Sequence, residues 1–124
     1  RGNASLPHFV RLNKLKKNKF INIKEEHWDR LTLDMKEVVM SPSGTGKNAD
    51  PDITGLQLFG KTGTAENPHG DDHAWFIGWM ELNGLKFSVV VLHENGGSGG
   101  TVAAPIARKI FENLVKENNL ISQK

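Results

Sequence analysis

The stretch Leu-Gln-Leu-Phe-Gly-Lys-Thr-Gly-Thr-Ala-Glu at residues 56–66 is the segment around which the sequence is organised. Its leucines alternate with other side chains, which is the period of a β-strand. Along a strand, Lys61 and Gly63 point to one face, and Thr62 and Thr64 point to the other. A glycine inside a strand often marks the close approach of a ligand or of another backbone. The segment therefore predicts either a binding strand with an ammonium and two hydroxyls, or an ordinary edge strand with a solvated lysine.

Two more strand-like runs follow at residues 73–82 and 85–93, and Asn83-Gly84 joins them. Asn-Gly is a strong hairpin signal, because both central residues of a type I′ turn need positive φ. Together with residues 55–65, these runs predict a three-stranded antiparallel meander. The last run is apolar on both sides around residues 89–92, so we expect it to be covered on both faces.

Helices are predicted before and after the meander. Residues 25–40 and about 101–118 carry apolar side chains at three- and four-residue spacing. The expected apolar faces comprise Trp28, Leu31, Met35, Val38 and Val39 in the first helix, and Val102, Ile106, Ile110, Phe111 and Leu114 in the second. A glycine-rich bend precedes the second helix, and Pro105 fits its first turn. The fold class is α/β (α+β): a helix, the meander, and a C-terminal helix packed on the sheet.

Composition narrows the class of protein. The chain has 124 residues, 37% hydrophobic content and a net charge of +2, which suits one globular domain rather than a disordered segment. No apolar run is long enough to span a membrane, and no signal peptide is evident. The absence of cysteine removes disulfides and thiolate chemistry. We predict a solvated loop for the lysines at 14, 16, 17 and 19, with a phosphate or anionic-lipid contact as the alternative, and no nucleic-acid partner.

Two glycine patterns resemble nucleotide-binding motifs. Residues 55–62 match the P-loop pattern letter for letter, but a P-loop follows a buried strand and opens a helix. Here a polar segment precedes the pattern, and a proline and further glycines follow it. The glycines at 96–100 lie between a strand and a helix but lack the dinucleotide-binding spacing. Neither pattern has the required context, so nucleotide binding is the least favoured interpretation.

A third pattern concerns a metal. His69, Asp71, Asp72 and His73 are residue types that ligate zinc, and they fall close together. No second cluster with ligand spacing closes a site. A solvated loop is the favoured interpretation, and we expect neither a metal nor another cofactor.

The residues Lys61 to Glu66 resemble the lysine-threonine-glycine motif of penicillin-binding proteins, the D,D-transpeptidases of cell-wall synthesis. Other segments resemble the same family in the same order: residues 43–46, 73–78, 89–97 and 103–107. The details are most similar to the class B, elongation-type branch.

The resemblance implies acyl transfer through a serine, with β-lactams acylating the same serine. It gives Lys61 the role of supplying positive potential and a hydrogen bond near the active-site hydroxyls. Thr62, Thr64 and Ala65 would bind the substrate, and the two threonines would contact the carboxylate of a D-Ala-D-Ala stem peptide or of a β-lactam. The Thr64 N–H would be an oxyanion-hole donor, and Gly63 would keep the strand face open.

The sequence departs from the family in one respect. No serine is followed by lysine three residues on, and none by asparagine two residues on, so the Ser-x-x-Lys and Ser-x-Asn motifs are absent. We therefore expect residues 1–124 to be the C-terminal half of a transpeptidase domain, inactive alone and partnered by its N-terminal half. The family implies elongation-complex membrane partners and a place on the periplasmic face of the inner membrane, anchored by another segment. The alternative is a non-catalytic module that binds peptidoglycan or a partner protein.

Overall fold

The computed structural model describes residues 3–4 and 19–120. Its contacts divide the chain into two compact units, residues 1–32 and residues 33–124. In the first unit, β1 (Asn3–Ala4) pairs antiparallel with β2 (Lys19–Phe20). The predicted basic loop lies mostly outside the described residues, and only its last member, Lys19, falls within β2.

Helix α1 (Glu25–Met40) has the predicted bounds. Glu25 and Glu26 occupy its first turn, where acidic side chains complement the helix dipole. The apolar face is only partly buried, because Val39 is 1% exposed whereas Leu31 is 48% exposed. Leu31, a member of the expected apolar face, is therefore not part of the core.

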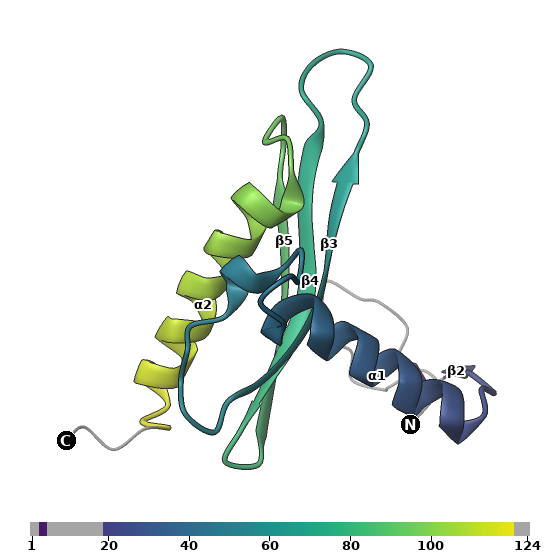
Figure 1. Ribbon diagram of the computed structural model, residues 1–124, viewed down its shortest axis with the longest axis vertical. Coiled ribbons are helices and arrows are strands. Elements are labelled where there is room, and N and C mark those ends of the chain that lie inside the picture. The colour runs from purple at the N-terminus through teal and green to yellow at the C-terminus, as the bar shows by residue number, and fades with distance from the viewer. Residues whose placement is uncertain (1–2, 5–18, 121–124) are drawn as a thin grey trace, which may run out of the picture. The chain divides into compact units, whose positions relative to one another are not determined.

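A three-stranded antiparallel sheet forms the centre of the second unit (Figure 1). Its order is β3 (Gln57–Ala65), β4 (His73–Leu82) and β5 (Leu85–His93). The predicted meander and its hairpin are confirmed, since Asn83 and Gly84 have φ of 51° and 79°. The strands β3 and β5 are the edges of this sheet within the described residues.

One face of the sheet carries the core. Its side chains include Leu58, Phe76, Met80, Val89 and Val91, all buried. The other face is open, because Ile77 is 46% exposed and Val90 is 67% exposed. The expectation that both faces of β5 are covered is wrong for the described residues, where Val91 lies on the buried face and its neighbour Val90 on the open one.

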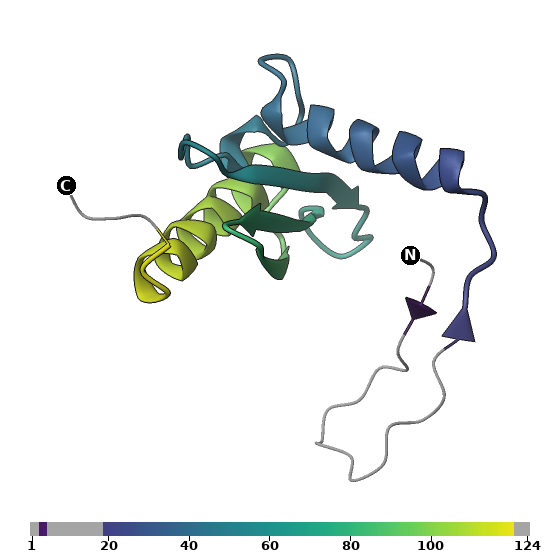
Figure 2. The same cartoon turned by 90° about the horizontal axis from the view of Figure 1, so that it is seen from below.

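Helix α2 (Ala104–Glu117) runs along the sheet and covers the core face (Figure 2). A π-helical turn, Gly99–Ala103, precedes it, so the helical segment starts two residues earlier than predicted. Phe111 is fully buried and meets Phe76 edge to face, with ring centroids 6.5 Å apart.

The buried stripe of α2 differs in part from the prediction. Ile110 is 36% exposed, whereas Ala103, Ala104 and Ala107 are fully buried. Small side chains let a helix approach a sheet closely, which explains why alanines rather than Ile110 occupy this contact. Pro105 lies in the first turn, as expected. No helix among the described residues is long and apolar enough to cross a membrane.

Candidate functional site

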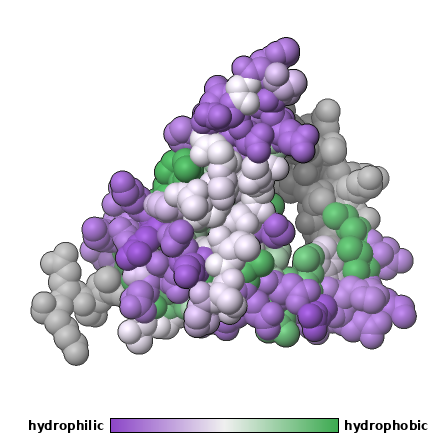
Figure 3. Space-filling model, turned by 45° about the horizontal axis from the view of Figure 1, so that its top comes forward, coloured by the Kyte–Doolittle hydropathy of each residue, from purple (hydrophilic) through white to green (hydrophobic). Residues whose placement is uncertain are grey.

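A cleft of about 460 Å³ lies beside the edge strand β3. Segments far apart in the sequence line it: Gly44 to Asn48, Thr62 to Thr64, and Ser98 to Thr101. The volume falls in the range of small-molecule sites. Figure 3 shows one face of the molecule, where side chains of intermediate hydropathy form a central band between hydrophilic ones.

The turn after α1 is held against β3 by its threonine. The Thr45 and Thr62 hydroxyls lie 3.0 Å apart and share a hydrogen bond. The Gly46 N–H donates to the Val38 carbonyl at 2.8 Å, which ties the turn to the end of α1. A Cβ at Gly44 would come closer than 3.0 Å to that same carbonyl oxygen, so only glycine fits this tight exit. The turn therefore presents the Thr45 hydroxyl to the strand.

The glycine-rich segment forms the opposite wall of the cleft. A Cβ at Gly99 would come closer than 3.0 Å to the carbonyl oxygens of Gly63 and Trp75. One at Gly100 would meet the Thr45 carbonyl oxygen just as closely, and the Asn48 side chain donates to the Gly100 carbonyl at 2.8 Å. Backbone thus packs on backbone here. The glycine spacing predicts only a tight connection here, whereas the adjacent glycines at the start of the helical segment serve this close packing.

The predicted site residues are only partly brought together. Thr62, Gly63 and Thr64 line the cleft, whereas Lys61 and Ala65 are not among its lining residues. Lys61 is exposed, and its ammonium donates to the Thr62 carbonyl at 2.6 Å. A different cation, Lys47, lines the cleft and donates to the Pro42 carbonyl at 3.3 Å.

The chemistry of this cleft suits a carboxylate. Its walls offer hydroxyls from Thr45, Thr62 and Thr64, and a nearby ammonium from Lys47. Because β3 is an edge strand among the described residues, every second N–H and C=O along it has no partner within the described sheet. Hydroxyl, ammonium and backbone N–H donors are the groups that stabilise an anion. None of the described residues that line this cleft is acidic.

The other sequence patterns receive different roles. Residues 57–65 form β3 and the next element is the strand β4, so the P-loop match does not have the strand–loop–helix context of a nucleotide site. Within the described part of the chain, no group of three or more His, Cys, Asp or Glu residues is arranged to hold a metal. His73, from the predicted zinc candidates, accepts a hydrogen bond from the Asn95 N–H at 3.0 Å instead.

Comparison with known proteins places these features in a family. Residues 1–112 match the family model described as the penicillin-binding protein transpeptidase domain. The peptidoglycan D,D-transpeptidase MrdA of Haemophilus influenzae is 34% identical over 100 residues, covering 68% of this chain and 15% of that protein. The peptidoglycan D,D-transpeptidase PbpA of Mycobacterium tuberculosis is 44% identical over 71 residues, covering 48% of this chain and 14% of that protein.

Solved structures agree with the sequence relatives. A crystal structure of Pseudomonas aeruginosa PBP2 in complex with WCK 5153 superposes with a TM-score of 0.67 at 28% identity, covering 83% of this chain and 22% of that one. Penicillin-binding protein A of M. tuberculosis, as an imipenem acyl-enzyme complex, gives a TM-score of 0.60 at 30% identity, covering 82% of this chain and 22% of that one. The chain thus spans about a fifth or less of the length of these relatives.

Proposed function

Because the chain belongs to the penicillin-binding protein transpeptidase family, we propose that it supplies the substrate-binding wall of a peptidoglycan D,D-transpeptidase. The family resemblance and the fold class predicted from the sequence are thereby confirmed. The observation that carries the proposal is the cleft along β3, where Thr62, Gly63 and Thr64 face hydroxyl and amide groups from two other segments.

In this proposal the hydroxyls of Thr62 and Thr64 bind the terminal carboxylate of a D-Ala-D-Ala stem peptide or the carboxylate of a β-lactam. The Thr64 N–H, on the edge strand, donates to the oxyanion that develops on the attacked carbonyl. One such preorganised donor is typically worth about 3 kcal/mol of transition-state stabilisation. Gly63 keeps its face of the strand open, and Ala65, at the end of β3, contributes to substrate binding.

Lys61 acts from beside the cleft in this scheme. Its ammonium is exposed and within reach of the strand edge, where it already contacts the Thr62 carbonyl. There it raises the positive potential at the attacked carbonyl and donates to the active-site hydroxyls of a companion segment. This role needs the side chain to leave Thr62, which the open surroundings of Lys61 allow.

The nucleophile comes from polypeptide outside these 124 residues, since no serine here has the Ser-x-x-Lys arrangement. That serine attacks the penultimate D-Ala carbonyl, forms an ester and releases the terminal D-Ala. The amine of a second stem peptide then attacks the ester, which frees the serine and forms the cross-link. Residues 1–124 are thus the C-terminal part of the transpeptidase domain, active beside its N-terminal half.

The open face of the sheet supports a companion of this kind. Ile77, Val90 and Leu92 are each more than two-fifths exposed on that face, and β5 is a free edge among the described strands. Exposed apolar area of this sort marks an interaction surface. The relatives named MrdA and PBP2 support the elongation-type assignment, and with it membrane partners and a periplasmic position at the inner membrane.

Labelling with a fluorescent penicillin, followed by intact mass measurement of every polypeptide in the preparation, tests the proposal. We expect the label on a companion polypeptide that carries Ser-x-x-Lys and none on this chain. A label on this chain would overturn the proposal, because one of its own serines would be the nucleophile. Binding of a D-Ala-D-Ala peptide without acylation, even beside a companion, would favour the non-catalytic binding module instead.

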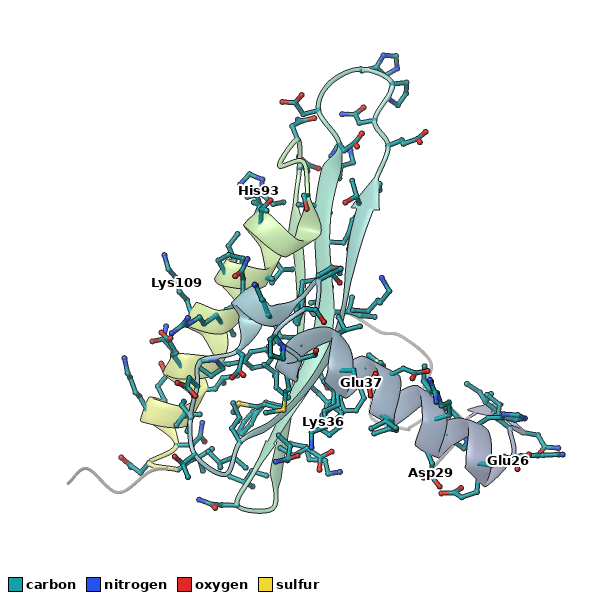
Figure 4. The ribbon with its side chains drawn as sticks, viewed as in Figure 1. Glu26, Asp29, Lys36, Glu37, His93 and Lys109 are labelled. Atoms are coloured by element: carbon teal, nitrogen blue, oxygen red, sulfur yellow. The ribbon has the colours of Figure 1, made fainter. Side chains whose placement is uncertain are left out.

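The role of Lys61 has its own test in the full-length protein. Lys61→Ala should lower the rate of β-lactam acylation about 100-fold, the size typical for losing one preorganised electrostatic contact. The fold should stay intact, because Lys61 is exposed. Lys109→Ala, at an exposed position that Figure 4 labels on α2, is the matched control and should acylate normally. Unchanged acylation in Lys61→Ala would remove the role given to it.

A further inference from the structure

Two loops lie at the same end of the sheet (Figure 1). The first, residues 66–72, connects β3 to β4. The second, residues 94–98, connects β5 to the π-helical turn that lines the cleft. Figure 4 labels His93 where this second loop leaves β5. The proposed function gives no role to the first loop, and in the second loop it uses only Ser98, which lines the cleft.

Hydrogen bonds join the two loops through both side chains and backbone. The Asn67 side-chain amide donates to the Asn95 side-chain oxygen at 2.7 Å. The Asn95 N–H donates to His73 Nδ1 at 3.0 Å, and the Gly97 N–H donates to the Asp72 carbonyl at 2.7 Å. Each bond pairs a residue of the first loop, or the residue that follows it, with one of the second. The two loops are therefore joined directly by three hydrogen bonds.

The backbone of the second loop is shaped for these contacts. Asn95 and Gly97 have φ of 53° and 73°, in the left-handed region that asparagine and glycine tolerate best. In the first loop, a Cβ at Gly70 would lie 2.9 Å from the Asn95 side-chain oxygen, so a side chain there would displace the Asn95 amide from its present position. Both loops therefore carry the residue types that a close fit requires.

The joined loops lead directly along the chain to two segments that line the cleft. Asn67 follows soon after Thr64 along the chain, and Asn95 comes just before Gly99, which packs on the Gly63 backbone. We propose that Asn67, His73 and Asn95 form a latch that positions Gly99 against Gly63 and so sets the width of the cleft. They are positioning residues, because none of them lines the cleft. The consequence for a ligand rests on the proposed function, whereas the latch itself does not.

Amide hydrogen exchange of these residues, measured in the full-length protein, tests the latch directly. Thr101 and Val102 report on the cleft wall, since their N–H groups donate to the Ser98 carbonyl at 3.3 and 3.0 Å. Asn67→Ala removes the side-chain donor, and Asn95→Gly removes its acceptor while keeping the left-handed backbone accessible. In both variants we expect the backbone amides of Gly97, Thr101 and Val102 to exchange at least about fivefold faster than in wild type. This is the effect of losing one hydrogen bond.

Two further variants separate the latch from general loosening. Asn95→Asp keeps a side-chain oxygen acceptor for Asn67 and should restore the wild-type exchange rates. Asn83→Gly removes another left-handed asparagine, which donates to the Leu120 carbonyl at the opposite end of the sheet, and should leave Thr101 and Val102 unchanged. Amides at the centre of β4 serve as an internal reference, because global unfolding would accelerate them equally.

The latch is overturned if Asn67→Ala and Asn95→Gly leave Thr101 and Val102 within twofold of wild type. It is equally overturned if Asn95→Asp exchanges as fast as Asn95→Gly, because the acceptor would then not matter. Failure of the proposed function looks different. If the penicillin label were absent or on this chain, the proposed function would fail, but the exchange rates of the variants would not be affected. If the variants exchanged like wild type, the latch would fail, but the penicillin label would still appear on the companion polypeptide.

Discussion

Gly99→Ala sets two effects of opposite sign against each other. Gly99 lies in the π-helical turn before α2, and in an open helix the change to alanine raises stability by about 1 kcal/mol. Here, however, Gly99 is buried, and its added Cβ would come closer than 3.0 Å to the carbonyl oxygens of Gly63 and Trp75. Both oxygens belong to strand backbone, so no side chain can rotate away. Overpacking of this kind costs about 1–3 kcal/mol, and more where nothing yields.

We expect the clash to exceed the gain in propensity, so that the free energy of unfolding falls by about 1–2 kcal/mol or more. Urea unfolding of the 124-residue chain, followed by circular dichroism, measures this change. A change in stability alone shifts the urea midpoint and leaves the dependence of the free energy of unfolding on urea concentration unchanged. Asn113→Ala, at an exposed position of α2, reports propensity alone and should raise stability by about 0.5 kcal/mol. A Gly99→Ala variant as stable as wild type, or more so, would refute the close packing inferred for the cleft wall.

Three further predictions concern the core, the hairpin and the cleft. Phe111→Ala should lower the free energy of unfolding by about 3–5 kcal/mol in urea titrations, because the side chain is fully buried. Hydrogen bonding to Lys86 lowers the pKa of Glu81, so Glu81 contributes stability that is present above the unfolded-state pKa and is lost as the pH falls through the folded-state pKa. The stability difference between wild type and Glu81→Gln should accordingly shrink on acidification, and a difference that grows would contradict the assignment. In a double-mutant cycle, Thr45→Val and Thr62→Val should show a coupling of about 0.5–1.5 kcal/mol, whereas strict additivity would mean that their hydroxyls do not interact.

Local signals account for the elements that were predicted with their full bounds. The helix at 25–40 and the strands at 73–82 and 85–93 have the predicted ends. Each is bounded by turn chemistry that acts over a few residues, such as the positive φ required at Asn83 and Gly84. Tertiary contacts did not need to override these preferences.

The start of the last helical segment shows where local signals fail. Glycine is a poor helix former, so the sequence predicts a start at Thr101, after Gly99 and Gly100. The chain becomes helical at Gly99 because only glycines let this turn pack on the backbone of β3 and on the turn at Thr45. Packing likewise leaves Ile110 exposed and buries alanines, since the distance between helix and sheet decides which side chains fit.

The sequence by itself determined the family and the fold class, because these depend on a contiguous motif and on short-range periodicity, and it singled out Thr62 to Thr64, which line the cleft. Tertiary structure alone decided that Thr45, Asn48 and Ser98 to Thr101 join that segment, and that Lys61 lies outside the cleft it borders. The physical reason is the separation along the chain over which each kind of information acts. A motif records which groups are adjacent along the chain, whereas the groups that face one another across a cleft are set by the packing of segments many residues apart.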